Sequence, residues 1–470
     1  MNTEGSLKQV INGGYCVGCG ACAALDRDIS VRMDDIGRLQ AVLPEGQVPA
    51  RAATAACPFT GVGPSEDALA QDLFTTPGLR EDTRIGRYLA CYGGWVIEDD
   101  LRARGSSGGI STYVQRDLLA HGYVDAVLNV TPRSGGEGGA PLFSFTVART
   151  PDEVMANAKT RYYPTEMSGV IAHILEYPGR YAAVGTPCFA KALRLAARQS
   201  PDLKERLVFV LGIVCGHLKT TAFAQALAAQ CGIDPKRIDK IDFRTKLEGR
   251  PASGYGVQVT GARPDGTRDS VTRPMEGLIG ANWGHGLFKY KACEFCDDVL
   301  AETADAVMGD AWLPGYDDDH RGANVVVVRH PLLQDLLVRA RAAGRLHLDD
   351  LSADDVAASQ AGGLRHRREG LAYRLWLTDR AGDWRPKKRV KPGRRHLAPS
   401  MRRVHAARYL LGQISHTLWR DSSDLEVFAS LITPEINAYD RMLSPGLAQR
   451  TLSLVERKID AALFWLRLRR

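Results

Sequence analysis

The sequence predicts an α/β protein with a mixed sheet, preceded by a short cysteine-rich module and followed by a basic helical tail. From about residue 85 to 345, apolar β-type runs alternate with amphipathic helical stretches, an order typical of an α/β body. Three cysteines crowd residues 16–22, and residues 385–408 hold ten Lys or Arg and no acid. We therefore expect three domains, over residues 1–62, 80–375 and 384–470.

The predicted elements of the core follow one another at short intervals. Strands are expected at 88–97, 124–130, 180–184, 206–214 and 324–329, and helices at 110–121, 189–199, 219–231 and 332–343. Two shorter strands, at 241–244 and 256–260, indicate that part of the sheet is antiparallel or mixed. Amphipathic helices are predicted near 401–420, 424–432 and 447–468 in the tail.

The composition indicates the class of protein and the cellular compartment in which we expect it. The chain of 470 residues is 44% hydrophobic and 24% charged, values of a globular protein. It has no apolar run of transmembrane length and no secretory start, so we expect it in the cytoplasm. Clustered cysteines in that reducing compartment favour metal binding or redox chemistry over disulfides.

The net charge of +7 comes from one segment. Without the ten cations between Arg385 and Arg408, the rest of the chain carries a net charge of −3. The basicity is local, and that segment lacks interleaved aromatics for base stacking. We therefore expect no nucleic acid partner.

The first cysteine set has the spacing of an iron–sulfur loop. Cys16, Cys19 and Cys22 form a Cys-x2-Cys-x2-Cys run with interspersed glycines, which lets one tight loop bind three corners of a cubane. Asp26 stands where a two-cluster ferredoxin would have its next cysteine, and Cys57, followed by Pro58, is the remote fourth ligand. These residues predict a ferredoxin-like module with one [4Fe–4S] cluster. A structural zinc site is the alternative.

A second set combines Cys293 and Cys296, in a Cys-x2-Cys motif, with Cys188 and Cys215, which end predicted strands. Strand ends of an α/β body meet at one edge of the sheet, so four thiolates distant in sequence can converge there. Zinc competes with iron at this site as well.

Several segments resemble the coenzyme F-420 hydrogenase/dehydrogenase beta-subunit family, whose relatives include divinyl chlorophyllide and hydroxymethyl chlorophyll reductases. They are CVGCGAC with a later CP, SSGGISTYVQRDLLAHGYVDAV, AKTRYYPTEM, GTPCFAKALR, LGIVCGH, and FKYKACEFCDDVLAETADAVMGDAW followed by ANVVVVR. The resemblance spans roughly residues 10 to 370. It implies that Cys188, Cys215, Cys293 and Cys296 hold a [4Fe–4S] cluster beside an FAD.

A small-residue loop and a basic–aromatic segment are the predicted flavin site. Ser106, Ser107, Gly108 and Gly109 precede a helix whose N-terminal amides could bind a pyrophosphate, or the loop could simply cap the helix. The resemblance favours FAD there, and it places the segment with Lys159, Arg161 and Tyr162 along the flavin. Thr160 replaces the family's usual Ser in that segment.

Four further candidates are single residues. The resemblance places Asp310 near the second cluster and the flavin, and Asn324 is a candidate hydrogen-bonding partner; both could instead be turn or capping residues. His217 and His285 are candidate proton donors, because reduction of a carbon substrate at a flavin requires protons, or they could be structural.

Together these features predict an iron–sulfur flavoprotein oxidoreductase with two [4Fe–4S] clusters and FAD. The expected donor is ferredoxin, a similar one-electron carrier or a deazaflavin coenzyme, acting with a small-molecule substrate. The alternatives are a non-catalytic electron-transfer subunit, such as one linked to polysaccharide biosynthesis, and a zinc-stabilised binding protein. We expect the tail to pack on the body or a partner subunit; peripheral association with the inner membrane face is its alternative.

Overall fold

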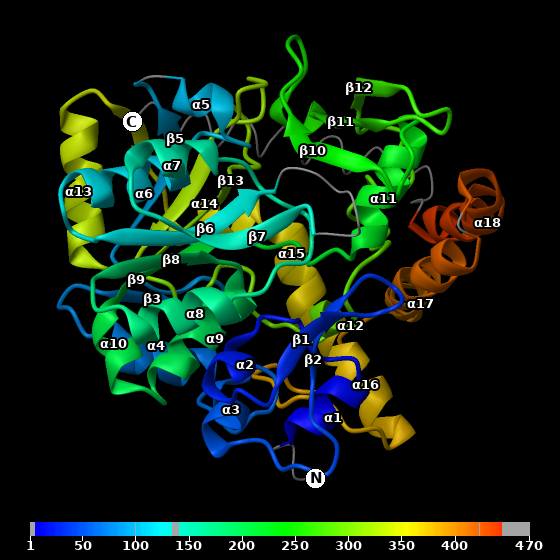
Figure 1. The fold of residues 1–470 in the computed structure, drawn as a ribbon, viewed down its shortest axis with the longest axis horizontal. Helices are drawn as coiled ribbons and strands as arrows, with labels where there is room; N and C mark the ends of the chain where they lie inside the picture. Colours follow the sequence, from blue (N-terminus) through cyan, green and yellow to red (C-terminus); the bar gives the residue numbers. More distant parts are fainter. Residues whose placement is uncertain (1–4, 99, 134–140, 423, 444–470) are drawn as a thin grey trace.

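The computed structural model describes residues 5–98, 100–133, 141–422 and 424–443 (Figure 1). Its largest sheet has eight strands in the order β15-β5-β14-β13-β9-β8-β6-β7. The bounds are β5 (Ala90–Val96), β6 (Ala126–Pro132), β7 (Phe143–Ala148), β8 (Tyr181–Gly185), β9 (Leu207–Ile213), β13 (Ala306–Asp310), β14 (Asn324–Val328) and β15 (Leu346–Asp350).

This sheet is mixed, as predicted. The central strands β13, β9, β8 and β6 pair in parallel, whereas β14, β5, β15 and β7 pair antiparallel to their neighbours. Parallel pairing of β8 and β9 brings the segments that follow them to the same edge. That edge carries the candidate site.

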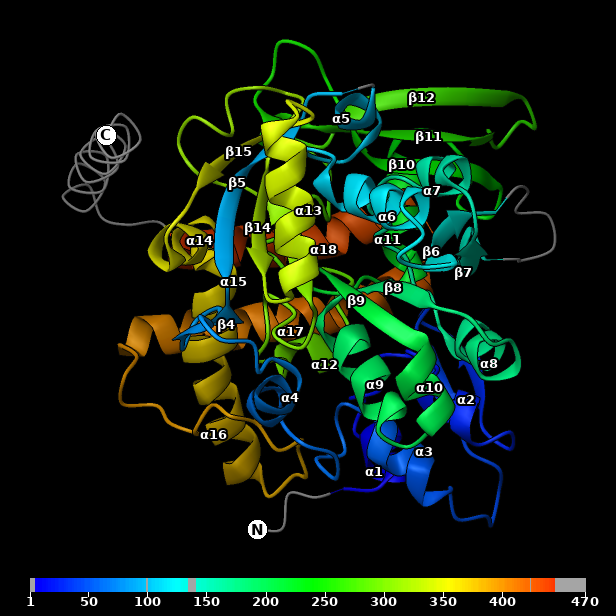
Figure 2. The same cartoon turned by 90° about the vertical axis from the view of Figure 1, so that its left-hand side faces the viewer.

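Helices cover both faces of the sheet, because alternate strand residues point to opposite sides. Val326 and Val328 pack with one group of helices, and Val325 and Val327 with the other. Figure 2 shows α13 lying along the sheet beside α6 on the first face. The first group is α6 (Ile110–Ala120), α7 (Pro151–Ala156) and α13 (Pro331–Ala342); the second is α8 (Ser168–Glu176), α9 (Pro187–Ala197) and α10 (Pro201–Arg206).

The two short strands predicted at 241–244 and 256–260 do not belong to the main sheet. They form a separate antiparallel sheet with a third strand: β10 (Ile238–Thr245), β11 (Gly256–Ala262) and β12 (Arg268–Pro274). Its apolar side shares a core with α11 (Thr221–Gln230) and with the tail helices α17 (Pro399–Ser422) and α18 (Leu425–Leu443). The mixed character of the main sheet comes instead from β7, β14, β5 and β15.

The cysteine-rich N-terminal segment packs against the body and shares its core. Val17 and Phe59 lie in one apolar cluster with Phe189 of α9 and Ile171 of α8, and Figure 1 shows the blue N-terminal elements beside these helices. The elements are α1 (Leu7–Asn12), α2 (Ala21–Leu25), β1 (Ser30–Met33), β2 (Leu39–Val42), α3 (Arg51–Ala56), α4 (Glu66–Leu73), β3 (Arg80–Asp82) and β4 (Gly86–Tyr88).

Short elements complete the chain, and two tail predictions are matched by helices. The short elements are α5 (Leu101–Arg104), a 3-10 turn (Ala252–Gly254), α12 (Lys291–Glu294), α14 (Ala353–Ser359), α15 (Ala361–Arg365), a π-helical turn (His366–Gly370) and α16 (Leu371–Ala381). Helices α17 and α18 correspond to the predictions at 401–420 and 424–432; the helix predicted at 447–468 lies outside the described residues. No helix in the described part of the chain has both the length and the apolar character needed to cross a bilayer.

Candidate functional site

The first cysteine quartet encloses one small cavity between α1, α2 and α3. Cys16, Cys19, Cys22 and Cys57 all line it. The loop that carries the first three depends on glycine: Gly18 and Gly20 have φ of 65° and 81°. A Cβ on Gly18 would lie 2.3 Å from the Leu39 carbonyl oxygen, so only glycine lets this loop close against β2.

The chemistry of these thiols fits an electron-rich metal cluster. The Gly18 and Ala41 amides donate to Cys16 Sγ at 3.4 and 3.3 Å, the kind of N–H···S contact that tunes cluster potentials. Burial raises the pKa of all four thiols, that of Cys57 to about 12. Thiolates here therefore need positive charge in the cavity, which iron supplies.

The second quartet assembles at the edge that β8 and β9 share. Cys188 lies in the first turn of α9, and Cys215 follows β9 by two residues. Cys293 belongs to α12, and Cys296 lies just beyond its end. After burial, the other three thiols are the main influences that raise the pKa of Cys188, so the four are close neighbours. Within the described ranges, no three His, Cys, Asp or Glu side chains are arranged to hold a single metal ion.

Arg367 is a buried cation directed at this second quartet. It is 2% exposed, and its guanidinium donates to Cys296 Sγ at 2.8 Å and to the Cys215 and Gly216 carbonyls at 2.8 and 2.7 Å. No carboxylate in the described residues forms an ion pair with it. A buried charge requires a counter-charge, and thiolates at this quartet provide one. Sequence reasoning missed Arg367, which lies in the π-helical turn.

Side chains connect the two quartets directly. Tyr15, beside Cys16, packs edge-to-face on Phe295, between Cys293 and Cys296, with ring centroids 4.9 Å apart. The Leu39 amide of the first module donates to the Tyr290 hydroxyl at 2.9 Å, at the start of α12. The quartets are thus neighbours across a short aromatic layer.

A large cavity adjoins the second quartet. Its volume is about 760 Å³, within the range of roughly 300–1,000 Å³ typical of ligand and cofactor sites. Cys215 lines it, and so do most of the predicted flavin and catalytic residues: Ser106, Ser107, Gly109, Lys159, Arg161, Tyr162, His217, Asp310 and Asn324. Gly108 and His285 do not line it.

The small-residue loop is held in place by the sheet edge. Ser107 Oγ donates to the Ala323 carbonyl at 2.6 Å, and Asn324 Oδ1 accepts from the Ile110 amide at 3.0 Å. A Cβ on Gly108 would lie 2.7 Å from the Gly94 carbonyl oxygen. Gly108 therefore serves close packing, and Asn324 caps α6. Ser106, Ser107 and Gly109 are the loop residues that line the cavity.

The basic–aromatic segment presents a cation to the cavity. Arg161 Nε is buried without a hydrogen-bond partner in the described residues, although the guanidinium donates to the Ala158 carbonyl at 2.9 Å. Burial lowers the pKa of Arg161 to about 10. Lys159 has a φ of 103°, a strained conformation common at functional sites, and pairs with Asp242 at 2.9 Å. An anionic ligand would satisfy Arg161.

Sequence reasoning missed Arg244, which organises this wall. Its side chain is 4% exposed and binds Asp310 through two contacts, of 2.9 and 3.1 Å. The same guanidinium donates to the Ser106 carbonyl at 3.3 Å and to the Tyr162 hydroxyl at 3.4 Å. Asp310 thus acts on the cavity through Arg244. A lone Arg near the end of a short strand gave no signal in the sequence.

The two predicted histidines differ. His217 is buried against Trp283, with ring centroids 4.3 Å apart, and its Nε2 has no hydrogen-bond partner in the described part of the chain. His285 Nε2 instead contacts Asp440 Oδ1 of α18 at 3.0 Å. His217 is therefore available to a ligand in the cavity, whereas His285 holds the tail helix.

Comparison with known proteins identifies the family. Two family profiles match, both for the beta subunit of coenzyme F420 hydrogenase/dehydrogenase. The profile of its C terminus matches residues 179–354, and that of its N terminus matches residues 91–172. Together the matches cover more than half of the chain. The chain belongs to the coenzyme F420 hydrogenase/dehydrogenase beta-subunit family.

A solved structure is also similar. A chain in a xenon-derivatised F420-reducing [NiFe] hydrogenase complex from Methanosarcina barkeri aligns with 18% identity and a TM-score of 0.45; the match covers 61% of this chain and 92% of that one. No curated protein sequence matches significantly. The first cysteine quartet, Arg367 and helices α17 and α18 all lie outside the segments matched by the F420 hydrogenase/dehydrogenase beta-subunit profiles.

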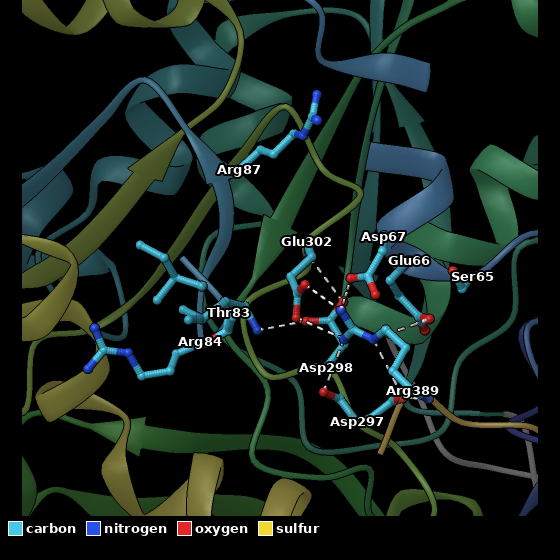
Figure 3. A network of polar contacts seen from close by, with 12 residues as sticks. Ser65, Glu66, Asp67, Thr83, Arg84, Arg87, Asp297, Asp298, Glu302 and Arg389 are labelled. Carbon is cyan, nitrogen blue, oxygen red and sulfur yellow. Dashed lines mark hydrogen bonds and ion pairs between the residues drawn. The ribbon is translucent and has the colours of Figure 1, made fainter. Parts of the chain in front are cut away.

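Two residues of the basic run are bound inside the body, and Figure 3 shows the contacts of one of them, Arg389. Arg389 contacts Glu302 at 2.6 Å, Asp67 at 2.5 Å and Asp297 at 3.6 Å, and Lys388 pairs with Asp297 at 3.4 Å. Asp297 directly follows Cys296. This short segment therefore connects the N-terminal module to the loop after the second quartet, and these two cations do not form a free basic face.

We expect stability to depend on pH through Lys246, beside the small-residue loop at 106–109. Its Nζ donates to the Ser107 carbonyl at 3.1 Å, and burial, then Lys159, lowers its pKa from 10.5 to about 7. Between those values the unfolded state binds more protons, so the free energy of unfolding rises with pH. Between pH 7 and 9, the free energy of unfolding of the wild type should rise by about 2 kcal/mol more than that of Lys246→Met. Urea denaturation at both pH values measures the free energy of unfolding. An equal change with pH in the wild type and in Lys246→Met would contradict the prediction.

Proposed function

We propose that the chain is an iron–sulfur flavoprotein oxidoreductase that moves electrons between a one-electron carrier and a substrate through two [4Fe–4S] clusters and FAD. One observation carries the proposal: Cys215 belongs to the second quartet and also lines the large cavity with Arg161 and Tyr162. A cluster at that quartet and a flavin in that cavity would lie within contact distance of each other. Membership in a family of hydrogenase and dehydrogenase subunits supports an oxidoreductase role.

The proposed cluster ligands are the two cysteine quartets. Cys16, Cys19, Cys22 and Cys57 would hold one cluster, and Cys188, Cys215, Cys293 and Cys296 the other. Bound FAD exchanges one or two electrons, so it can connect one-electron clusters to a two-electron substrate.

Each side chain on the flavin side of the cavity has a distinct role in this proposal. Ser106 and the amides at the start of α6 would bind the pyrophosphate. Arg161 would neutralise the negative charge of the reduced ring, and Tyr162 would pack on it. Arg244 and Asp310 keep this wall rigid through their paired contacts. His217 lines the cavity, and burial, then Lys219, lowers its pKa well below the ordinary value, so a bound anion would be needed for this ring to hold the proton that a reduced carbon atom takes up.

The first quartet is the proposed entry or exit point for single electrons. It lies outside the profile matches and has the cysteine spacing of a ferredoxin, so a ferredoxin-type carrier is the proposed partner. A deazaflavin coenzyme that exchanges hydride at the flavin is the alternative donor.

Anaerobic purification followed by iron, sulfide and flavin quantitation tests the proposal. We expect about eight iron atoms and eight sulfides per chain, from two cubanes, and one FAD. Turnover of the purified chain with reduced ferredoxin, deazaflavin or NAD(P)H then separates an enzyme from an electron-transfer subunit. A colourless protein with stoichiometric zinc would overturn the redox function.

Replacement of Cys57 by Ser should remove the first cluster alone. Iron content is expected to fall by about half, with flavin retained, because the second quartet and the cavity do not include this residue. Cys231→Ser is the control: Cys231 is buried, whereas Cys57 is half-buried, and it lies at the end of α11, outside both quartets. Equal iron in both variants would refute the assignment of Cys57.

A further inference from the structure

The tail helices form one wall of the large cavity. Val404, His405 and Arg408 of α17 and Tyr439 of α18 line it. Both helices are fixed to the loop at 283–285: Arg408 donates to the Trp283 carbonyl at 2.9 Å, and the Tyr439 hydroxyl donates to the Gly284 carbonyl at 3.2 Å. The tail is therefore part of the site, and it lies beyond the profile matches, which end at residue 354.

This end of the cavity is rich in cations that lack carboxylate partners. Lys219 is 2% exposed, donates to the Leu287 carbonyl at 2.6 Å, and lies 4.9 Å from the Trp283 ring centroid. Arg408 donates to a carbonyl and to His366 Nδ1, at 2.8 Å for the latter. Neither cation forms an ion pair with any carboxylate in the ranges that the structure describes. Glu369, the acid on this wall, is exposed.

Polar atoms at this end also lack partners. Arg408 Nε, His405 Nδ1 and His217 Nε2 are buried and make no hydrogen bond within the described residues. Burying unpaired cations and unsatisfied donors is costly, and an anionic group in the cavity would satisfy both.

We propose that the end of the cavity walled by α17 and α18 is the substrate site, and that it takes a molecule with a carboxylate or phosphate group, held by Arg408 and Lys219 beside Trp283. This inference rests on the proposed function, which assigns the part of the cavity lined by Ser106 and Arg161 to the flavin. His217 lies against the Trp283 ring, which also packs on Tyr162 of the flavin part with ring centroids 4.7 Å apart. A substrate anchored by its anion would place its remaining atoms toward His217 and the flavin part.

Calorimetric titration of the anaerobically purified holoprotein with inorganic phosphate and with benzoate tests the site. Arg408→Gln should weaken binding by about 10- to 100-fold, because a charge-assisted hydrogen bond is lost, and Arg408→Lys should retain part of the affinity. Arg403→Gln is the matched control, since Arg403 lies exposed on α17 and does not line the cavity. Binding of phosphate alone or benzoate alone would support the site and name its anion.

Flavin and metal contents of the same samples separate the outcomes. Equal binding by Arg408→Gln and Arg403→Gln, or no binding to the wild type, would overturn the inference. Loss of flavin from Arg408→Gln would also overturn it, because the cations would then bind the cofactor's phosphates. A protein without iron and flavin that still binds anions through Arg408 would retain the anion site and overturn the proposed redox function.

Discussion

Replacement of Arg389 by Met is expected to lower the free energy of unfolding by about 3–5 kcal/mol, the cost of leaving buried charges without their partner. The side chain is 12% exposed and faces Glu302, which is 3% exposed, and Asp297, which is 1% exposed. Its two terminal nitrogens contact both Glu302 oxygens, at 2.6 and 2.9 Å. Without the guanidinium, these buried carboxylates repel one another and have little water to screen their charges. Urea denaturation at neutral pH measures the loss.

Lys387→Met is the control for that prediction. Lys387 is exposed and lies two residues earlier in the same basic run, so its loss should change the free energy of unfolding by less than about 0.5 kcal/mol. Comparable losses for the two variants would show that the run stabilises the protein only through general charge.

Arg367→Gln is expected to make the reduction potential of the proposed second cluster more negative. The variant loses a buried positive charge and an N–H donor to Cys296, both of which favour the added electron. A hydrogen bond to a charged group is worth roughly 1.5–3 kcal/mol, and tenfold in a one-electron equilibrium corresponds to 59 mV, so the shift should be about 60–130 mV. Redox titration followed by electron paramagnetic resonance measures it, and an iron content equal to that of the wild type shows that the variant has lost neither proposed cluster.

Two control variants test whether the shift in potential is specific to the Arg367 side chain. Arg367→Lys keeps the charge but loses the fork that reaches Cys296, Cys215 and Gly216, so it should give a smaller shift. Arg365→Gln removes an exposed cation two residues away and should leave the potential unchanged. An unaltered potential in Arg367→Gln would contradict the tuning role.

The sequence contained enough information for both cysteine quartets. Cys16, Cys19 and Cys22 are close along the chain, so their spacing alone indicates a shared site. Cys188 and Cys215 could be placed together because parallel strands bring their carboxyl ends to one edge, and β8 and β9 do pair in parallel. The mixed α/β core was predictable for the same reason: alternating apolar runs carry the strand and helix pattern locally.

Other parts of the site depend on contacts that no local pattern encodes. Arg367 stands in a charged stretch that is typical of an exposed helix, and the π-helical turn that directs it inward leaves no mark in the sequence. Arg408 likewise belongs to a basic run, and its place in the cavity is set by how α17 packs on α11. An amphipathic pattern predicts that a helix face is buried, but not what covers it.

The position of Arg389 has a consequence for biosynthesis. Its partner Asp67 precedes it by 322 residues, so the ribosome must complete more than four fifths of the 470-residue chain before the acidic cluster meets its guanidinium. Until then the nascent chain holds these carboxylates uncompensated beside the loop that carries Cys296. The second quartet therefore gains its cysteines and the charge balance of its neighbouring loop later in synthesis than the first, because Cys16, Cys19, Cys22 and Cys57 all lie within the first sixty residues.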